Sequence, residues 1–314
     1  MIDGADARSA RLRQAAQPVQ TGLQPDVIPL IRDYISLTKP RIISLLLLTT
    51  VATMFVADPS GPALSTILWT MLGGYLAAGG AGAINHYIDR NRDARNTRTS
   101  SRPLADGRIK PLHGLIFGIT LGVAAFFQLW FTVNFLAAAL AMVGLFGYVF
   151  LYTLWLKPLT PQNIVIGGSA GAVPPLVGWA AATGGLSWEA MWTFLIIFFW
   201  TPPHFWALSL MIKDDYAKTG VPMLPVVKGE EATRQSILIY TVFMVGFTVG
   251  PYCTGLLGPL YLAASIVLGL IYIGFSFALW RNPGPKITLQ AYLYSLAYLA
   301  LLFIFMAVAA VAQA

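Results

Sequence analysis

Oxygen-bearing side chains recur every four residues in one short segment of this chain, at Asn85, Asp89 and Asp93. In a helix this spacing places the three side chains on one face, with a drift of about 40° per step. Magnesium usually takes one or two carboxylates together with water and the phosphate oxygens of a substrate. We therefore predict that Asn85, Asp89 and Asp93 are metal ligands and that the metal ion holds a diphosphate.

A diphosphate also needs positively charged partners, and several basic residues are candidates. Arg98 and Arg102 follow the acidic segment directly, and the planar guanidinium suits bidentate phosphate contacts. The expected diphosphate contacts are Arg98, Arg102, Lys157 and Lys213. Lys39 and Arg41 are weaker candidates, because both could instead anchor the first membrane helix through their long side chains.

A second acidic cluster, Asp214 and Asp215, occurs in a later loop. We expect Asp215, and with it Asp214, to bind a second metal ion or to orient a lysine. The predicted catalytic acids are therefore Asp89, Asp93 and Asp215, and Mg²⁺ is the predicted cofactor. Charge runs can also form a solvated, charge-balanced loop, but the four-residue spacing and the second cluster favour a site.

Nine apolar stretches must position these residues. The chain of 314 residues is 57% hydrophobic and only 11% charged, which is more apolar surface than one soluble core buries. A spanning helix needs roughly 20 mainly apolar residues. The stretches are 42–57, 63–84, 112–131, 135–156, 163–183, 188–211, 237–257, 259–280 and 288–312. We predict an all-α integral membrane protein with nine transmembrane helices around a central cavity.

The basic residues predict the orientation of these helices, since Lys and Arg concentrate in cytoplasmic loops. All 20 of them precede the first stretch or fall in the even-numbered loops. This predicts a cytoplasmic N-terminus, an outside C-terminus and a site on the cytoplasmic side. The net charge of +7 is then mainly a topology signal and poor support for nucleic-acid binding. We predict a polar, mobile tail over residues 1–36 and a transmembrane domain over residues 37–314.

A run of small residues at 77–83 directly precedes the acidic segment. Glycine and alanine let membrane helices approach each other closely. We expect this run to pack tightly on a neighbouring helix and so to hold residues 85–93 rigidly at the mouth of the cavity.

The acidic segment and the residues after it resemble the membrane-embedded aromatic prenyltransferase superfamily. Its Asn-x-x-x-Asp-x-x-x-Asp motif and Arg-Thr-x-x-Arg-Pro signature match this sequence at Asn85, Asp89, Asp93, Arg98, Thr99, Arg102 and Pro103. Segments 37–41, 160–168, 200–208 and 220–227 are similar to the heme-farnesylating branch of that superfamily. The resemblance covers roughly residues 34–285. Thr219 stands where many members carry a further aspartate, which favours the heme branch over the quinone-precursor branch.

The resemblance implies an enzyme of a bacterial inner membrane that transfers the farnesyl group of farnesyl diphosphate to a vinyl group of heme B. Water is added in the same reaction, the product is heme O, and heme A synthase is implied as a partner. His204, well inside an apolar stretch, could contact the heme or could hydrogen-bond a neighbouring helix. Two alternatives remain open: a prenyltransferase for an aromatic quinone precursor or another tetrapyrrole, and a transporter.

Overall fold

The structure, a computed structural model, describes residues 27–314. Its elements in chain order are α2 (Val27–Thr38), α3 (Pro40–Ala57), α4 (Leu64–Asp93), α5 (Pro111–Thr132), α6 (Phe135–Phe146), the π-helix η1 (Gly147–Leu156), α7 (Lys157–Leu159), α8 (Asn163–Gly171), α9 (Val173–Thr183), α10 (Ala190–Met211), α11 (Lys213–Lys218), α12 (Leu224–Val227), α13 (Gly229–Phe247), α14 (Gly250–Cys253), α15 (Pro259–Arg281) and α16 (Pro285–Val311). No β-strand occurs among these residues. The predicted all-α fold is confirmed.

Nine helical spans within residues 27–314 are long and apolar enough to cross a membrane. Three of them are composite, because α6, η1 and α7 run on as one span, as do α8 with α9 and α13 with α14. Large apolar side chains such as Ile116, Phe127 and Leu270 are exposed on the outer faces of the bundle, as expected of helices that face lipid tails. The chain is therefore a multi-pass membrane protein, and the predicted number of spans is confirmed for the part that the structure describes.

Helix α2 changes the predicted boundary between tail and membrane domain. Residues 27–36, which the sequence analysis assigned to the tail, form most of this helix. Its Tyr34 ring packs edge-on against Phe117, with centroids 4.9 Å apart, and Leu37 is fully buried. With 12 residues, α2 is too short to span a membrane, and apolar length alone therefore does not predict it. The predicted tail before residue 27 lies outside the described residues.

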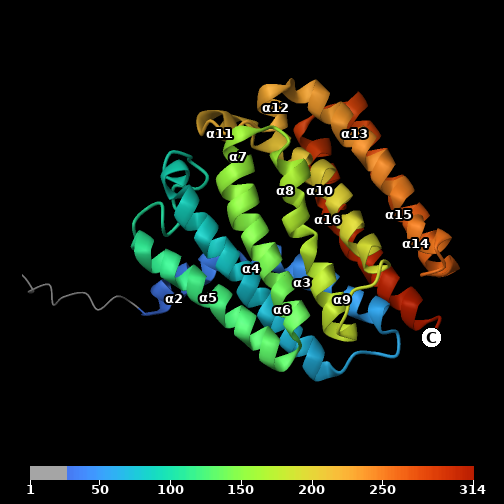
Figure 1. The fold of residues 1–314 in the computed structure, drawn as a ribbon. Helices are drawn as coiled ribbons and strands as arrows, with labels where there is room; N and C mark the ends of the chain where they lie inside the picture. Colours follow the sequence, from blue (N-terminus) through green and yellow to red (C-terminus); the bar gives the residue numbers. More distant parts are fainter. Residues whose placement is uncertain (1–26) are drawn as a thin grey trace, which may run out of the picture.

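The packing contacts join the described spans into a closed ring, and Figure 1 shows the bundle that they form. Neighbours in sequence pack side by side, as α4 does with α5 and α15 with α16. Helix α16 also packs against α3, which brings the last span beside the first. Helix α3 packs against α9 as well, so the first span contacts both the fifth and the ninth span.

The two acidic clusters lie at the same end of the bundle. Figure 1 shows α7, α11 and α12 at one end, and α14 and the C-terminus at the other. An ion pair between Arg98 and Asp215 joins the segment 94–110 to α11. The common end for both clusters agrees with the sequence analysis, while its cytoplasmic location stays a prediction.

Glycines of the 77–83 run let α4 approach two neighbours at backbone distance. A Cβ atom on Gly80 would lie 2.7 Å from the backbone oxygen of Gly118 in α5. A Cβ atom on Gly82 would lie 3.0 Å from the backbone oxygen of Leu37. The predicted close approach is confirmed, and it fixes α4 between α5 and the junction of α2 with α3.

We expect Gly80→Ala to destabilise the protein by about 1–3 kcal/mol, because overpacking at this contact forces backbone shifts. Gly274→Ala is the matched control, since a Cβ there would meet no atom of a neighbouring helix within 4 Å and alanine favours the helix. Unfolding midpoints in detergent measure both variants. A Gly80→Ala midpoint at or above that of Gly274→Ala would contradict the close contact.

Candidate functional site

The C-terminal part of α4 faces a polar cavity of about 410 Å³. Asn85, Asp89 and Asp93 line this cavity together, and each of them is buried. The rest of the wall comes from residues 39–42, the segment 96–102, η1, α7, α8, α10 and the segment 212–221. We call it the acidic cavity, and it brings the three predicted metal ligands onto one surface.

Asp89 accepts three hydrogen bonds in the acidic cavity. Its Oδ2 accepts from Lys157 Nζ and, at 2.9 Å, from Asn85 Nδ2. The guanidinium of Arg92 lies 3.4 Å from Oδ1. Because a buried carboxylate is costly without such partners, these contacts offset the cost of burying Asp89. Lys157, a predicted diphosphate contact, is thereby placed at the centre of the site.

Asp93 holds the segment after α4 against the end of that helix. Arg102 Nη1 donates a hydrogen bond to Asp93 Oδ2 at 2.8 Å. The buried hydroxyl of Thr99 donates to the backbone oxygen of Asp93 at 3.1 Å. The Arg-Thr-x-x-Arg signature therefore folds back on α4, and both predicted arginines, Arg98 and Arg102, line the acidic cavity.

The later acidic cluster reaches the site only at its edge. Asp215 Oδ2 accepts a hydrogen bond from Arg98 Nε at 3.3 Å, whereas Asp214 is exposed. Tyr216 on the same short helix lines the cavity, and burial raises the pKa of its phenol to about 12, so it stays a hydrogen-bond donor. Asp215 thus orients an arginine where the sequence analysis expected a lysine, and Asp214 lies outside the cavity wall.

A π-helix sets the register of the fourth span at the cavity. Tyr148 and Tyr152 belong to η1, Lys157 follows it directly, and all three line the acidic cavity. Tyr152 and Lys157 are five residues apart. Their side chains would diverge by about 140° in an α-helix, but the i→i+5 repeat of a π-helix keeps them on one face. The two tyrosines were not among the predicted site residues.

Lys39, a weaker candidate in the sequence, lies inside the acidic cavity. Its Nζ donates a hydrogen bond to Asn85 Oδ1 at 2.7 Å and lies 3.4 Å from the Tyr148 hydroxyl. Burial, with the nearby Arg102, lowers the pKa of the Lys39 ammonium to about 8. Arg41, the other weak candidate, is exposed, as expected of a membrane anchor.

The backbone of Lys39 is strained. Its φ of 58° and ψ of 56° put it in the left-handed region, and it is the only non-glycine residue with a positive φ among the described residues. Pro40 follows it and disfavours a right-handed helical conformation at this position. Strain of this kind collects at functional sites, where the surrounding structure holds it in place.

Lys213 lies outside the acidic cavity, contrary to the expected diphosphate contact. Its Nζ donates a hydrogen bond to Glu230 Oε1 at 3.1 Å, and half of that carboxylate residue is exposed to solvent. The acid at the start of α13 therefore draws the lysine away from the site.

His204 also lies outside the acidic cavity. The face of α10 that meets the cavity carries Thr201, Phe205 and Leu208. His204 points instead toward α16, where its Nδ1 lies 2.6 Å from Ser295 Oγ. Its ring stacks between Trp200 and Tyr292, with centroids 4.2 and 5.0 Å away. This is the contact between helices that the sequence analysis left open as the alternative to heme contact.

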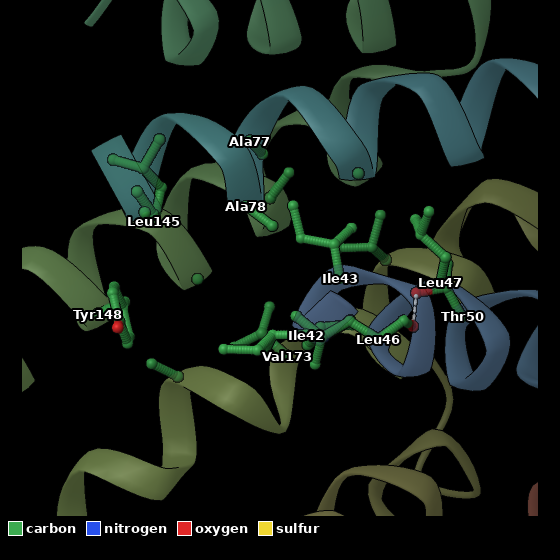
Figure 2. Close-up of a pocket in the computed structure, with 18 of the residues that line it drawn as sticks. Ile42, Ile43, Leu46, Leu47, Thr50, Ala77, Ala78, Leu145, Tyr148 and Val173 are labelled. Carbon is green, nitrogen blue, oxygen red and sulfur yellow. Dashed lines mark hydrogen bonds between the residues drawn. The ribbon is translucent and has the colours of Figure 1, made fainter. Parts of the chain in front are cut away.

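A narrow apolar cavity of about 140 Å³ adjoins the acidic one. Figure 2 shows Ile43, Leu46 and Leu47 of α3 opposite Ala77 and Ala78 of α4 around this space. Three residues, Lys39, Ile42 and Tyr148, line both cavities. The pair of cavities suits a ligand with a charged head and a hydrocarbon chain.

The donor set of the acidic cavity fits a hard divalent cation that is shared with a ligand. Among the described residues, no three His, Cys, Asp or Glu side chains gather as a metal cluster. Asn85, Asp89 and Asp93 offer two carboxylates and an amide oxygen instead, which suits Mg²⁺ because it keeps waters and takes substrate phosphate oxygens. The surrounding arginines and lysines fit those phosphates.

The chain is similar to known proteins in sequence. A profile of the UbiA prenyltransferase family matches residues 46–304. A protoheme IX farnesyltransferase of Roseiflexus sp. (strain RS-1) is 52% identical over 279 residues, which are 89% of this chain and 52% of that relative. A protein of the same name from Symbiobacterium thermophilum is 48% identical over 295 residues, 93% of this chain and 97% of the relative. The chain spans about half the length of several curated relatives that it matches, the Roseiflexus protein among them.

A solved structure shares the fold. The structure of a UbiA homolog from Archaeoglobus fulgidus, bound to GPP and Mg²⁺, aligns with a TM-score of 0.68 at 17% sequence identity. The alignment covers 89% of this chain and 99% of that chain. At this identity the similarity shows the helical architecture, and the chemistry of the present site rests on its own residues.

Proposed function

This chain belongs to the UbiA prenyltransferase family, and we propose that it transfers the farnesyl group of farnesyl diphosphate to a vinyl group of heme B. Water is added in the reaction, and the product is heme O. The observation that carries the proposal is the acidic cavity, in which Asn85, Asp89 and Asp93 face arginines and lysines beside an apolar cavity. The choice of acceptor is supported by relatives about 50% identical that are named protoheme IX farnesyltransferase.

The difficult step is the separation of charge. The bond between farnesyl C1 and the diphosphate oxygen breaks, and the diphosphate leaves with the electron pair. The π electrons of the vinyl group form the new carbon–carbon bond, water adds to the remaining vinyl carbon, and that water loses a proton. Fixed cations aimed at the leaving group stabilise this transition state. The cations that line the acidic cavity and would fill this role are Arg98, Arg102, Lys157 and Lys39.

Asn85, Asp89 and Asp93 would hold Mg²⁺, which when bound neutralises part of the charge on the departing diphosphate. The GPP and Mg²⁺ of the Archaeoglobus fulgidus homolog support a divalent metal for this fold. The phenols of Tyr148, Tyr152 and Tyr216 line the same cavity. A substrate that fills this cavity would displace water, which strengthens each electrostatic contact inside.

The apolar cavity would take the first part of the farnesyl chain. Its lining from α3 and α4 is almost wholly hydrocarbon. Lys39, Ile42 and Tyr148 line both cavities, so the reacting carbon would lie beside them. Lys and Arg residues gather in the loops at this end, which supports a reaction on the cytoplasmic side of a bacterial inner membrane. Heme A synthase would take up the product.

The proposal predicts that purified protein converts heme B into a product heavier by one farnesyl group and one hydroxyl group, when it is given farnesyl diphosphate and Mg²⁺. Mass spectrometry of the extracted heme measures the conversion. EDTA should abolish turnover, since the diphosphate would lack its metal partner. Excess Mg²⁺ should restore turnover.

A substrate panel separates the alternatives. An unchanged heme pool, with prenylation of an aromatic quinone precursor by the same preparation, would overturn the heme acceptor. Accumulation of an unaltered substrate across sealed vesicles, with no prenylated product from any acceptor, would favour a transporter.

A further inference from the structure

A second polar cavity lies beside Lys39 and Arg102, between α2, α4 and the segment 94–110. Its volume is about 530 Å³, which is within the range of small-molecule sites. The charged and titratable residues of its wall are Arg32, Asp33, Lys39, His86, Arg102 and Arg108. We call it the basic cavity, since four cationic side chains meet one carboxylate there.

The cations of the basic cavity differ in how far they are already paired. Arg102 forms an ion pair with Asp93, and Arg108 forms ion pairs with Asp33 and Asp106. Arg32 makes no hydrogen bond or ion pair within residues 27–314. Among the described residues, the basic cavity therefore contains one guanidinium with no anionic partner, and such a group suits a carboxylate or a phosphate.

His86 provides an independent sign of a ligand. It is 4% exposed, lines the basic cavity, and neither of its ring nitrogens has a hydrogen-bond partner. Buried polar atoms are nearly always paired, so an unpaired imidazole requires an explanation. A neutral imidazole offers one nitrogen that can donate a hydrogen bond and one that can accept one or bind iron.

The three cavities meet at two residues. Lys39 and Ile42 line the apolar, the acidic and the basic cavity, and Arg102 lines both polar ones. A molecule in the basic cavity would therefore adjoin the place where the diphosphate head and the hydrocarbon chain of the prenyl donor come together.

We propose, on the basis of the proposed function, that the basic cavity binds the acceptor. Heme B is flat and carries two carboxylates, so Arg32 and Arg108 bind the carboxylates while His86 faces the ring and its iron. The vinyl edge is then directed toward Lys39. This assigns the acceptor to the α2 side of α4, away from His204 on α10.

The test measures binding of heme B to the purified full-length protein without farnesyl diphosphate, by absorbance titration. Heme B should bind at least about 10-fold more tightly than its dimethyl ester, because charge-assisted hydrogen bonds to carboxylates are lost in the ester. Arg32→Ala should weaken heme B about 10-fold and leave the ester unchanged. Arg95→Ala is the matched control, since Arg95 is an exposed arginine outside the basic cavity.

His86 has a separate readout. His86→Leu should shift the Soret band of bound ferric heme while the preference for the acid over the ester remains. Iron-free protoporphyrin IX should bind this variant with the wild-type affinity and should still depend on Arg32. An unshifted Soret band would remove His86 from the site.

Equal affinity of the wild type for heme B and its ester, or equal effects of Arg32→Ala and Arg95→Ala, would overturn the proposal. The proposal would also be overturned if Arg32→Ala weakened the binding of diphosphate or phosphatidylglycerol but not the binding of heme B. That result would assign the basic cavity to those anions. Arg32-dependent heme binding without turnover would reject the proposed reaction alone. Normal turnover with Arg32-independent heme binding would reject the basic cavity alone.

Discussion

Asp89→Asn should lower turnover by roughly 10²–10³-fold while the protein still inserts and folds. The substitution keeps the shape of a side chain that is 2% exposed, so packing is preserved. It removes the negative charge that faces Lys157 and Arg92, and with it the strongest of the predicted metal ligands. The rate of heme O formation, followed by mass spectrometry, measures the effect.

Asp58→Asn is the control for this substitution. Asp58 follows α3 at the opposite end of the bundle, where its carboxylate accepts a hydrogen bond from Ser60. It should retain turnover close to that of the wild type. If Asp89→Asn and Asp58→Asn had equal rates, Asp89 would have no part in the chemistry.

Lys39→Asn should lower kcat by roughly 10–10²-fold. The ammonium lies where the three cavities meet, so it faces charge that develops as the diphosphate leaves. An interaction stronger in the transition state than in the ground state appears in kcat more than in KM. Asparagine tolerates the left-handed backbone at this position, so the variant removes the charge without adding strain. Steady-state kinetics with farnesyl diphosphate measures both constants.

Arg41→Asn tests whether the effect is specific to the cavity. Arg41 is exposed and lies outside all three cavities, two residues from Lys39. We expect nearly unchanged kinetics for it. Equal losses in the two variants would mean that basic residues here act only as membrane anchors.

Much of this fold could be predicted because its determinants are local. Apolar length sets the spans, and helical periodicity places Asn85, Asp89 and Asp93 on one face. The arginines of the following signature reach the same cavity because Arg102 pairs with Asp93, and they are close in sequence. These features need no knowledge of how distant helices pack.

The remaining site residues depend on tertiary contacts that sequence periodicity does not contain. Lys39 enters the cavity because Gly82 lets the backbone at Leu37 approach α4. Lys213 leaves it because Glu230 on another helix is its partner. Tyr152 lines the cavity because its segment forms a π-helix. The apolar composition of this segment would instead predict a regular α-helix.

Binding of a metal ion together with a diphosphate in the acidic cavity is the central claim to test. Mn²⁺ suits the same oxygen ligands as Mg²⁺, so its binding can be followed by electron paramagnetic resonance with farnesyl thiolodiphosphate as an unreactive donor. We predict tight Mn²⁺ binding that requires the analogue, with phosphorus hyperfine coupling, in the wild type and in Asp58→Asn. Asp89→Asn should lose it. Equal Mn²⁺ affinity in Asp89→Asn and the wild type, or absence of phosphorus coupling, would contradict the account.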